Sequence, residues 1–180
     1  DSFVPRFSFL NFGGDTEFFR EICLYRAARR MWAKIMRERF GAKNPRAWLY
    51  RPNRWADVGN DKKTVQRPLN NLTRCVLGGM MEALSGGSGM TGFPYDEPLG
   101  LGHSLEGWQL NLDASRIIQY EARLCDVTDP LAGSYYVEAL TDEIEAEAWD
   151  IIGKVDALGG AVAAIEKGFY QQEIARSAYR

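Results

Sequence analysis

VPRFSFLNFGGDTEFFREICLYRAARRMWAKIMRERFG, residues 4–41, contains the first strand signal of the chain and its most regular helix signal. Residues 4–12 alternate between polar and apolar side chains and are rich in aromatics, which is typical of a strand. A Gly-Gly-Asp turn at residues 13–15 ends this alternation. From Glu17 to Phe40 apolar residues recur every three or four positions, which predicts a helix that ends at Gly41.

The same order of strand and helix is repeated twice along the chain. AWLY, residues 47–50, is the second strand candidate; a loop over residues 54–63 follows it and leads to a predicted helix from Pro68 to Leu84. The glycine-rich segment 85–93 is the third strand candidate, and a predicted helix over residues 105–124 follows it. Alternating strands and helices are typical of an α/β architecture with parallel strands.

The last third of the chain is predicted to be helical, over residues 137–158, 161–167 and 170–180. Three strand–helix units are too few to close an eight-stranded barrel, so the pattern leaves open part of a barrel or a small open sheet. The first unit carries no GxGxxG fingerprint, which argues against a dinucleotide-binding domain.

Composition excludes several classes of protein. The 180 residues are 46% hydrophobic and 26% charged, as in globular proteins. A net charge of −2, from 22 basic and 24 acidic side chains, argues against a nucleic-acid-binding protein. Apolar runs are far shorter than the roughly 20 residues of a membrane span. Because the chain opens at Asp1 rather than Met, we expect a fragment of a larger protein.

The cysteines and the histidine offer little catalytic chemistry. Cys23, Cys75 and Cys125 lie in apolar helical patterns without a CxxC pair, so we expect three buried thiols in a reducing cytoplasm. His103 is the only histidine and stands in a glycine-spaced loop, which disfavours both a zinc site and Cys–His catalysis.

A family resemblance is spread over nearly the whole chain. It is carried by PRFSF (5–9), YRAARRMWA (25–33), MRERFGAK (36–43), QRPLNN (66–71), YDE (95–97), DPLAGSYYVE (129–138) and GGAVAAIEKG (159–168). These segments resemble the large chain of the adenosylcobalamin-dependent acyl-CoA mutases, of which methylmalonyl-CoA mutase is the best known.

The resemblance implies a fold. The family's substrate domain is a (β/α)8 TIM-type barrel, so this chain is expected to be α/β and to form roughly the C-terminal half of that barrel, with additional C-terminal helices. Residues 1–135 would hold the last βα units of the acyl-CoA-binding barrel, and residues 136–180 a helical extension of the same domain. The remaining barrel half would have to cover the open sheet edges.

The resemblance also implies an activity. The family isomerises the carbon skeleton of an acyl-CoA by a radical mechanism, as in the interconversion of methylmalonyl-CoA and succinyl-CoA. Adenosylcobalamin makes the radicals and is bound mainly by a domain absent from this chain. We therefore expect a cytoplasmic, oligomeric isomerase with an acyl-CoA substrate and a cobalamin-binding domain or subunit as partner, and an inactive fragment when this chain is alone. The protein is not expected to bind nucleic acid or a membrane.

Three residues match positions that bind ligands in the family. Arg6 and Ser8 match contacts to the CoA part of the substrate, and a guanidinium suits phosphate or carbonyl oxygens. Glu97 matches the acid that contacts the adenosyl ribose, where a carboxylate can accept from two hydroxyls. The alternatives are an ion-paired strand arginine and a plain loop carboxylate. Gln66 and Asn71 match by position, but hydrogen bonding at a helix start explains them equally well. No catalytic residue and no metal ligand is assigned.

Two segments depart from the family pattern. WADVGNDKKT (55–64) and GSGMTGF (87–93) replace polar sequences that line the substrate and cofactor side in the family. Trp55, Met90 and Phe93 suit a larger or less polar acyl group, for example that of benzylsuccinyl-CoA. The family's cobalt-ligand motif is absent, because His103 is followed by Ser-Leu-Glu-Gly.

The departures leave two functions open. The first is a mutase with an altered substrate, and the alternative is a catalytically inactive barrel-type partner subunit of such a mutase. An inactive partner has no reason to keep Arg6, Ser8 and Glu97 together, so these residues favour the enzyme. An unrelated α/β hydrolase or transferase is disfavoured, because no GxSxG or P-loop motif is present.

Overall fold

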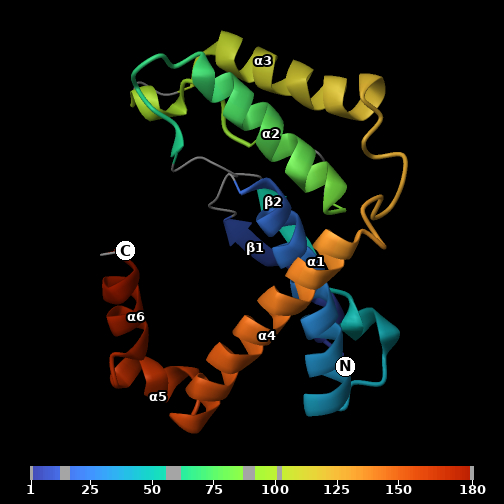
Figure 1. Cartoon of the computed structure of the whole chain (residues 1–180), viewed down its shortest axis with the longest axis vertical. Coiled ribbons are helices and arrows are strands. Elements are labelled where there is room, and N and C mark those ends of the chain that lie inside the picture. The colour runs from blue at the N-terminus through green and yellow to red at the C-terminus, as the bar shows by residue number, and fades with distance from the viewer. Residues whose placement is uncertain (1, 13–16, 56–61, 87–91, 101–102, 179–180) are drawn as a thin grey trace. The chain divides into compact units, whose positions relative to one another are not determined.

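A computed structural model of the chain (Figure 1) describes residues 2–12, 17–55, 62–86, 92–100 and 103–178. The chain divides into two compact units, Asp1–Thr141 and Asp142–Arg180. The described part is mostly helical, and none of its helices is long and apolar enough to cross a bilayer.

The first unit contains a short parallel sheet of two strands. β1 (Phe9–Phe12) pairs with β2 (Pro52–Trp55), and the register places Phe9 opposite Pro52 and Phe12 opposite Trp55. Parallel neighbours need a crossover connection, which helix α1 (Phe18–Lys34) supplies. This β1–α1–β2 order agrees with the predicted strand–helix alternation at this point of the chain.

The predicted strands differ from the observed ones in two places. The first strand begins at Phe9 instead of residue 4, because Pro5 starts a 3-10 turn, η1 (Val4–Arg6). The second prediction, a strand over residues 47–50, is wrong: η3 (Pro45–Trp48) is a 3-10 helix. The Asn44 side chain accepts a hydrogen bond from the backbone N–H of Arg46 at 3.0 Å and so caps this turn. The predicted third strand falls mainly on residues 87–91, which lie outside the described residues.

The long predicted helices are confirmed. α1 continues as a π-helical turn, η2 (Ile35–Arg39), and the chain reverses at Gly41 with φ of +60°. α2 (Asn70–Leu84) packs beside α3 (Leu105–Arg116), which ends in a second π-helical turn, η6 (Ile117–Glu121). Between α1 and α2, Ile22 and Met81 are fully buried core side chains.

The thiols are only partly as predicted. Cys23 and Cys75 are buried, and each lies 3.4 Å from a backbone carbonyl oxygen, of Val137 and Phe93 respectively. Cys125 is exposed, because it follows η6 in a loop instead of facing the inside of a helix. The expectation of three buried thiols is therefore wrong for Cys125.

The C-terminal helices follow the predicted order. α4 (Tyr135–Ala157) contains the boundary between the two units, and α5 (Ala161–Glu166) and α6 (Phe169–Ala178) follow it. In the second unit the Lys167 ammonium donates to the carbonyl oxygen of Leu158 at 2.9 Å, which holds α5 against the turn after α4. The predicted boundary between barrel and helical extension at residue 135 stays a prediction.

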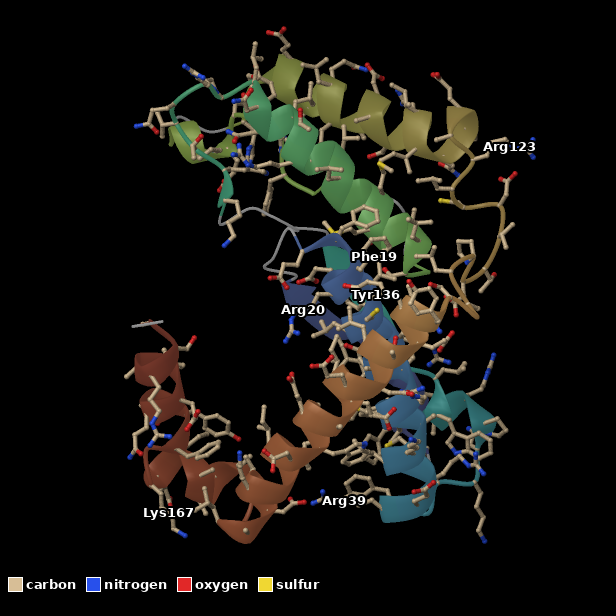
Figure 2. All side chains as sticks on the ribbon, viewed as in Figure 1. Phe19, Arg20, Arg39, Arg123, Tyr136 and Lys167 are labelled. Atoms are coloured by element: carbon tan, nitrogen blue, oxygen red, sulfur yellow. The ribbon has the colours of Figure 1, made fainter. Side chains whose placement is uncertain are left out.

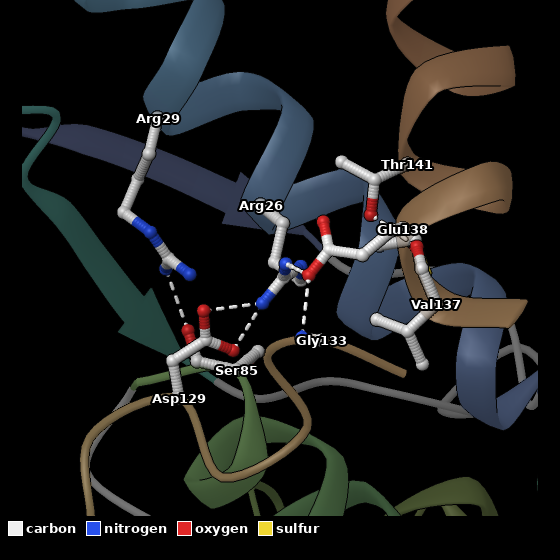
Figure 3. A network of polar contacts seen from close by, with 9 residues as sticks. Arg26, Arg29, Ser85, Asp129, Gly133, Val137, Glu138 and Thr141 are labelled. Carbon is white, nitrogen blue, oxygen red and sulfur yellow. Dashed lines mark hydrogen bonds and ion pairs between the residues drawn. The ribbon is translucent and has the colours of Figure 1, made fainter. Parts of the chain in front are cut away.

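A half-buried arginine joins α1 to the beginning of α4 (Figure 3). The Arg26 guanidinium contacts Asp129 and, at 2.5 Å, Glu138, and the backbone N–H of Gly133 donates to the same Glu138 oxygen at 2.9 Å. Nearby, Arg29 donates to the Ser85 carbonyl oxygen at 2.6 Å. The loop over residues 129–134 is thereby held to α1 and, through Ser85, α1 is joined to the end of α2.

Within this network the opposite charges of Arg26, Asp129 and Glu138 stabilise one another. Burial alone would lower the pKa of Arg26, but the hydrogen bonds that it donates to Glu138 and Asp129 raise that pKa above its ordinary value. The Gly133 N–H, together with Arg26, lowers the pKa of Glu138. Beside the network, Phe19 and Tyr136 pack edge to face with ring centroids 5.5 Å apart (Figure 2).

We expect Arg26→Met to loosen the start of α4. The Arg26 side chain is 10% exposed, but Asp129 and Glu138 remain within reach of water. We therefore expect the local free energy of opening of residues 137–141 to fall by about 1–3 kcal/mol. Amide hydrogen exchange in the complete protein measures it.

Arg116→Met is the matched control, since Arg116 is 61% exposed and pairs with Asp113 within one helix. It should change the same quantity by less than about 1 kcal/mol. Equal protection of residues 137–141 in both variants would show that Arg26 does not hold this segment.

Candidate functional site

Arg6 and Ser8 lie on one short exposed segment that is attached to Arg51 at both ends. The Arg51 guanidinium donates to the Pro5 carbonyl oxygen, and the Phe9 N–H donates to the Arg51 carbonyl oxygen at 3.0 Å. Neither Arg6 nor Ser8 is buried. Both side chains therefore stand immediately before β1 on a fixed backbone and are open to a ligand.

The ring of Phe9 anchors the start of β1. It packs edge to face on Trp32 and stacks on Tyr50, with ring centroids 4.7 Å apart in each case. An apolar cavity of about 470 Å³ lies next to the turn that carries Arg6; it is lined by Phe3, Val4, Phe7, Trp32, Met36, Phe40, Gly41 and Ala42. The surroundings of Arg6 thus combine two guanidinium groups, those of Arg6 and Arg51, with a large apolar surface.

Glu97 occupies a different corner of the first unit. It is the first residue of η5 (Glu97–Leu99) and is half-buried. Its backbone N–H donates to the Pro94 carbonyl oxygen at 3.2 Å. Within the described part of the chain its carboxylate has no hydrogen-bond or ion-pair partner, so none of these interactions joins it to Arg6 or Ser8.

Three buried side chains hold the backbone that leads to Glu97. We call Lys63, Asn71 and Asn111 the carbonyl-binding cluster, because each donates to a carbonyl oxygen of residues 92–95. The bonds run from Asn111 to Gly92 at 2.5 Å, from Lys63 to Phe93 at 2.8 Å and to Pro94 at 3.3 Å, and from Asn71 to Tyr95 at 3.0 Å. A segment without regular structure thus has its carbonyls paired, as buried backbone requires.

Asp96 extends this arrangement to the next residue. Its side chain is 5% exposed, and one carboxylate oxygen accepts from the Ser104 N–H at 2.9 Å, at the start of α3. A Cβ at Gly107 would stand 2.5 Å from the other oxygen, so only glycine fits there. Burial alone would raise the pKa of Asp96, but hydrogen bonds from Ser104 and the nearby His103 outweigh it and hold that pKa below its ordinary value.

The sequence did not single out Lys63 or Asn111. A signal for Asn111 exists in its register: Gly107, Asn111, Ala114 and Ile118 share the buried side of α3 and its π-helical extension. From the sequence, hydrogen bonding at a helix start explained Asn71 equally well. In the structure Asn71 exchanges hydrogen bonds with the backbone of Thr64 and also donates to the Tyr95 carbonyl oxygen. For Lys63 the partners are 30 and 31 residues away, so no local pattern reveals them.

Of the three residues that depart from the family pattern, Trp55 and Phe93 belong to the described residues and Met90 does not. Trp55 is the last residue of β2, opposite Phe12, and Met90 lies outside the described residues. The ring of Phe93 stacks on His103 with centroids 5.4 Å apart, and His103 packs edge to face on Trp108 at 5.3 Å. His103 therefore takes part in aromatic packing.

Comparison with known proteins gives matches along the full chain. The family model described as methylmalonyl-CoA mutase matches residues 1–180. The 2-hydroxyisobutanoyl-CoA mutase large subunit of Aquincola tertiaricarbonis is 37% identical over 99% of this chain and 31% of its own length. Methylmalonyl-CoA mutase of Escherichia coli (strain K12) is 35% identical over 100% of this chain and 24% of its own length. The chain therefore spans about a quarter to a third of the curated relatives it matches.

We expect Asp96→Asn to weaken the start of α3 in a pH-dependent way. Losing a charged acceptor of the Ser104 N–H should lower the local free energy of opening of residues 104–108 by about 1–3 kcal/mol at pH 7. Because the folded-state pKa is lowered, this contribution is complete above the unfolded aspartate pKa of about 3.9 and is lost as the pH falls through the folded value.

Amide hydrogen exchange at pH 7, pH 3 and pH 2 measures the difference between the variant and the natural protein. Asp113→Asn is the control, because Asp113 lies in α3 but is 45% exposed; its effect should be the same at every pH. A difference at residues 104–108 that stays constant down to pH 2 would contradict the assigned role of the Asp96 charge.

Proposed function

We infer a function from one premise: the chain belongs to the methylmalonyl-CoA mutase family, whose members are acyl-CoA carbon-skeleton mutases. We propose that it supplies part of the acyl-CoA-binding domain of a radical mutase that uses adenosylcobalamin. The observation that carries this proposal is the family match over all 180 residues. By itself the chain is expected to be inactive, and its proposed partners are the remaining barrel half and a cobalamin-binding domain or subunit.

We propose that the chain forms roughly the C-terminal half of a (β/α)8 barrel. The parallel β1–α1–β2 unit, followed by α2, supports this, because it has the order of barrel units. Apolar side chains exposed on α3 and its extension support it too, since further layers of a barrel would cover them; they are Leu105, Trp108, Leu112, Ile117 and Tyr120. A cytoplasmic location remains part of this proposal.

Arg6 and Ser8 are proposed to bind the CoA part of the substrate. Both precede β1, whereas Trp55 ends β2. In a barrel of parallel strands these positions lie at opposite ends. A thioester that extends along the barrel would then place its CoA part near Arg6 and its acyl group near Trp55.

Glu97 is proposed to hold the ribose of the cofactor's adenosyl group. Its half-buried carboxylate has no partner within the described residues, so it can accept hydrogen bonds from two neighbouring hydroxyls. When bound, adenosylcobalamin would supply the radical that removes a hydrogen atom from the substrate. This chain's residues would bind and orient the two molecules, and its aromatic side chains would help to exclude water.

The acyl group is proposed to be larger or less polar than methylmalonyl. Trp55 at the end of β2, with Phe93 half-buried beside His103, supports this. The names of two relatives specify different substrates, methylmalonyl-CoA and 2-hydroxyisobutanoyl-CoA. A branched or aryl-substituted acyl group such as benzylsuccinyl is therefore compatible with the family.

The test is a substrate panel. The complete protein, with its cobalamin-binding domain or subunit, is incubated without oxygen with adenosylcobalamin and methylmalonyl-, isobutyryl-, 2-hydroxyisobutyryl- or benzylsuccinyl-CoA. Mass spectrometry of the products should show an isomer of at least one of them. No isomer from any of the four, with cofactor binding confirmed, would instead favour the inactive partner subunit.

We expect Arg6→Ala to raise the Michaelis constant for the acyl-CoA about tenfold, because a charged hydrogen bond to the CoA part is lost. The Michaelis constant for adenosylcobalamin should stay within about twofold. Arg46→Ala, another exposed arginine, is the control. An unchanged Michaelis constant for the acyl-CoA would exclude Arg6 as a CoA contact.

We expect Trp55→His to shift substrate preference toward smaller and more polar acyl groups, because it shortens the apolar side chain proposed to face the acyl group. The ratio of kcat/KM for methylmalonyl-CoA to that for benzylsuccinyl-CoA should rise about tenfold. Trp149→His, in the second unit, is the matched control. The same ratio in both variants would mean that Trp55 does not determine specificity.

A further inference from the structure

We propose that Lys63 is a positioning residue for Glu97: its ammonium group fixes the backbone of residues 93–94 and thereby sets where the Glu97 carboxylate stands. The inference rests on the proposed role of Glu97 as a ligand of the adenosyl ribose.

The contact between the two residues runs through a single carbonyl oxygen. The Pro94 oxygen accepts from the Lys63 ammonium at 3.3 Å and from the Glu97 N–H at 3.2 Å. The same ammonium also binds the Phe93 oxygen at 2.8 Å. A displacement of Lys63 therefore moves the acceptor that closes the turn over residues 94–97, immediately before η5, of which Glu97 is the first residue.

The burial of Lys63 indicates that a hydrogen-bond donor is needed at this position. The side chain is only 9% exposed, and a buried ammonium is costly unless its protons are hydrogen-bonded. Two carbonyls supply acceptors for two of its three protons. A residue that merely filled space here would be apolar, because an apolar side chain of similar length avoids the desolvation cost.

Because Asn71 and Asn111 hold neighbouring carbonyls independently of Lys63, the positioning role of Lys63 can be tested without unfolding the protein. Asn111 holds the Gly92 oxygen from α3, and Asn71 holds the Tyr95 oxygen from α2. Neither of these bonds involves Lys63. We therefore expect loss of Lys63 to release residues 93–97 without unfolding either helix.

The experiment uses the complete protein with its cobalamin-binding domain or subunit. Lys63→Met should raise the Michaelis constant for adenosylcobalamin about tenfold, the effect of losing one charged hydrogen bond, and change that for the acyl-CoA less than twofold. Lys63→Arg, which keeps the charge and the donors, should restore most of the loss. Lys62→Met removes a neighbouring exposed lysine and is the matched control.

A double variant tests whether Lys63 acts through Glu97. If it does, Lys63→Met combined with Glu97→Gln should impair use of adenosylcobalamin no more than Glu97→Gln alone. Additive losses, or equal rises in both Michaelis constants, would overturn the proposal. If Lys63→Met does not fold, Lys63→Gln, which keeps a hydrogen-bond donor but removes the charge, should show the same preference for the cofactor constant.

Amide hydrogen exchange separates this inference from the proposed function. In Lys63→Met, the amides of residues 95–100 should exchange at least about tenfold faster while those of α2 keep their protection. Absence of isomerisation by the natural protein would refute the proposed function only. Unchanged exchange at residues 95–100 would refute the positioning role, whatever the activity.

Discussion

The ion pairs that the half-buried Arg26 forms with Asp129 and Glu138 are the interaction on which the first unit depends. Arg26 lies on α1 and contacts two carboxylates, one in the loop after α3 and one in the first turn of α4. Since these segments are more than 100 residues from Arg26 in the chain, local preferences cannot bring them together. A planar group with several fixed donors can satisfy both acids at once, which an ammonium could not do with the same geometry.

The same unit also contains a second set of polar interactions, the hydrogen bonds of the carbonyl-binding cluster, which has a different structural role. Arg26 joins segments through opposite charges, whereas Lys63, Asn71 and Asn111 pair the carbonyls of an irregular segment with side-chain donors. Irregular backbone inside a protein needs such partners, because neither a helix nor a sheet supplies them. Glu97, two residues after Tyr95, is the residue proposed to bind the cofactor. These side-chain donors therefore fix the backbone just before a proposed ligand-binding position.

The sequence predicted the helices better than it predicted which side chains interact over long distances in the chain. Helix α1 was predictable because its apolar periodicity is long and regular, and the same holds for α2 and α4. The strand predicted at residues 47–50 was wrong, because the Asn44 cap and Pro45 favour a 3-10 turn. The observed strand begins with Pro52 and Asn53, residue types that are depleted in strands, so local preference did not indicate it, and it pairs with β1. Arg6, Ser8 and Glu97 came from resemblance. Lys63 could not be found in this way, since its role depends on carbonyls brought near by the fold.

The π-helical turns at the ends of α1 and α3 determine where these helices can change length. In each, a backbone N–H bonds the carbonyl five residues earlier, from Phe40 to Ile35 and from Ala122 to Ile117. Such a turn holds one residue more than an α-helical turn. Deleting a residue there would restore α-helical spacing and leave the preceding side chains, Arg26 included, in register. In each helix the extra residue of the π-helical turn therefore lies at the C-terminal end. The packed positions in the N-terminal part of the helix keep their orientation.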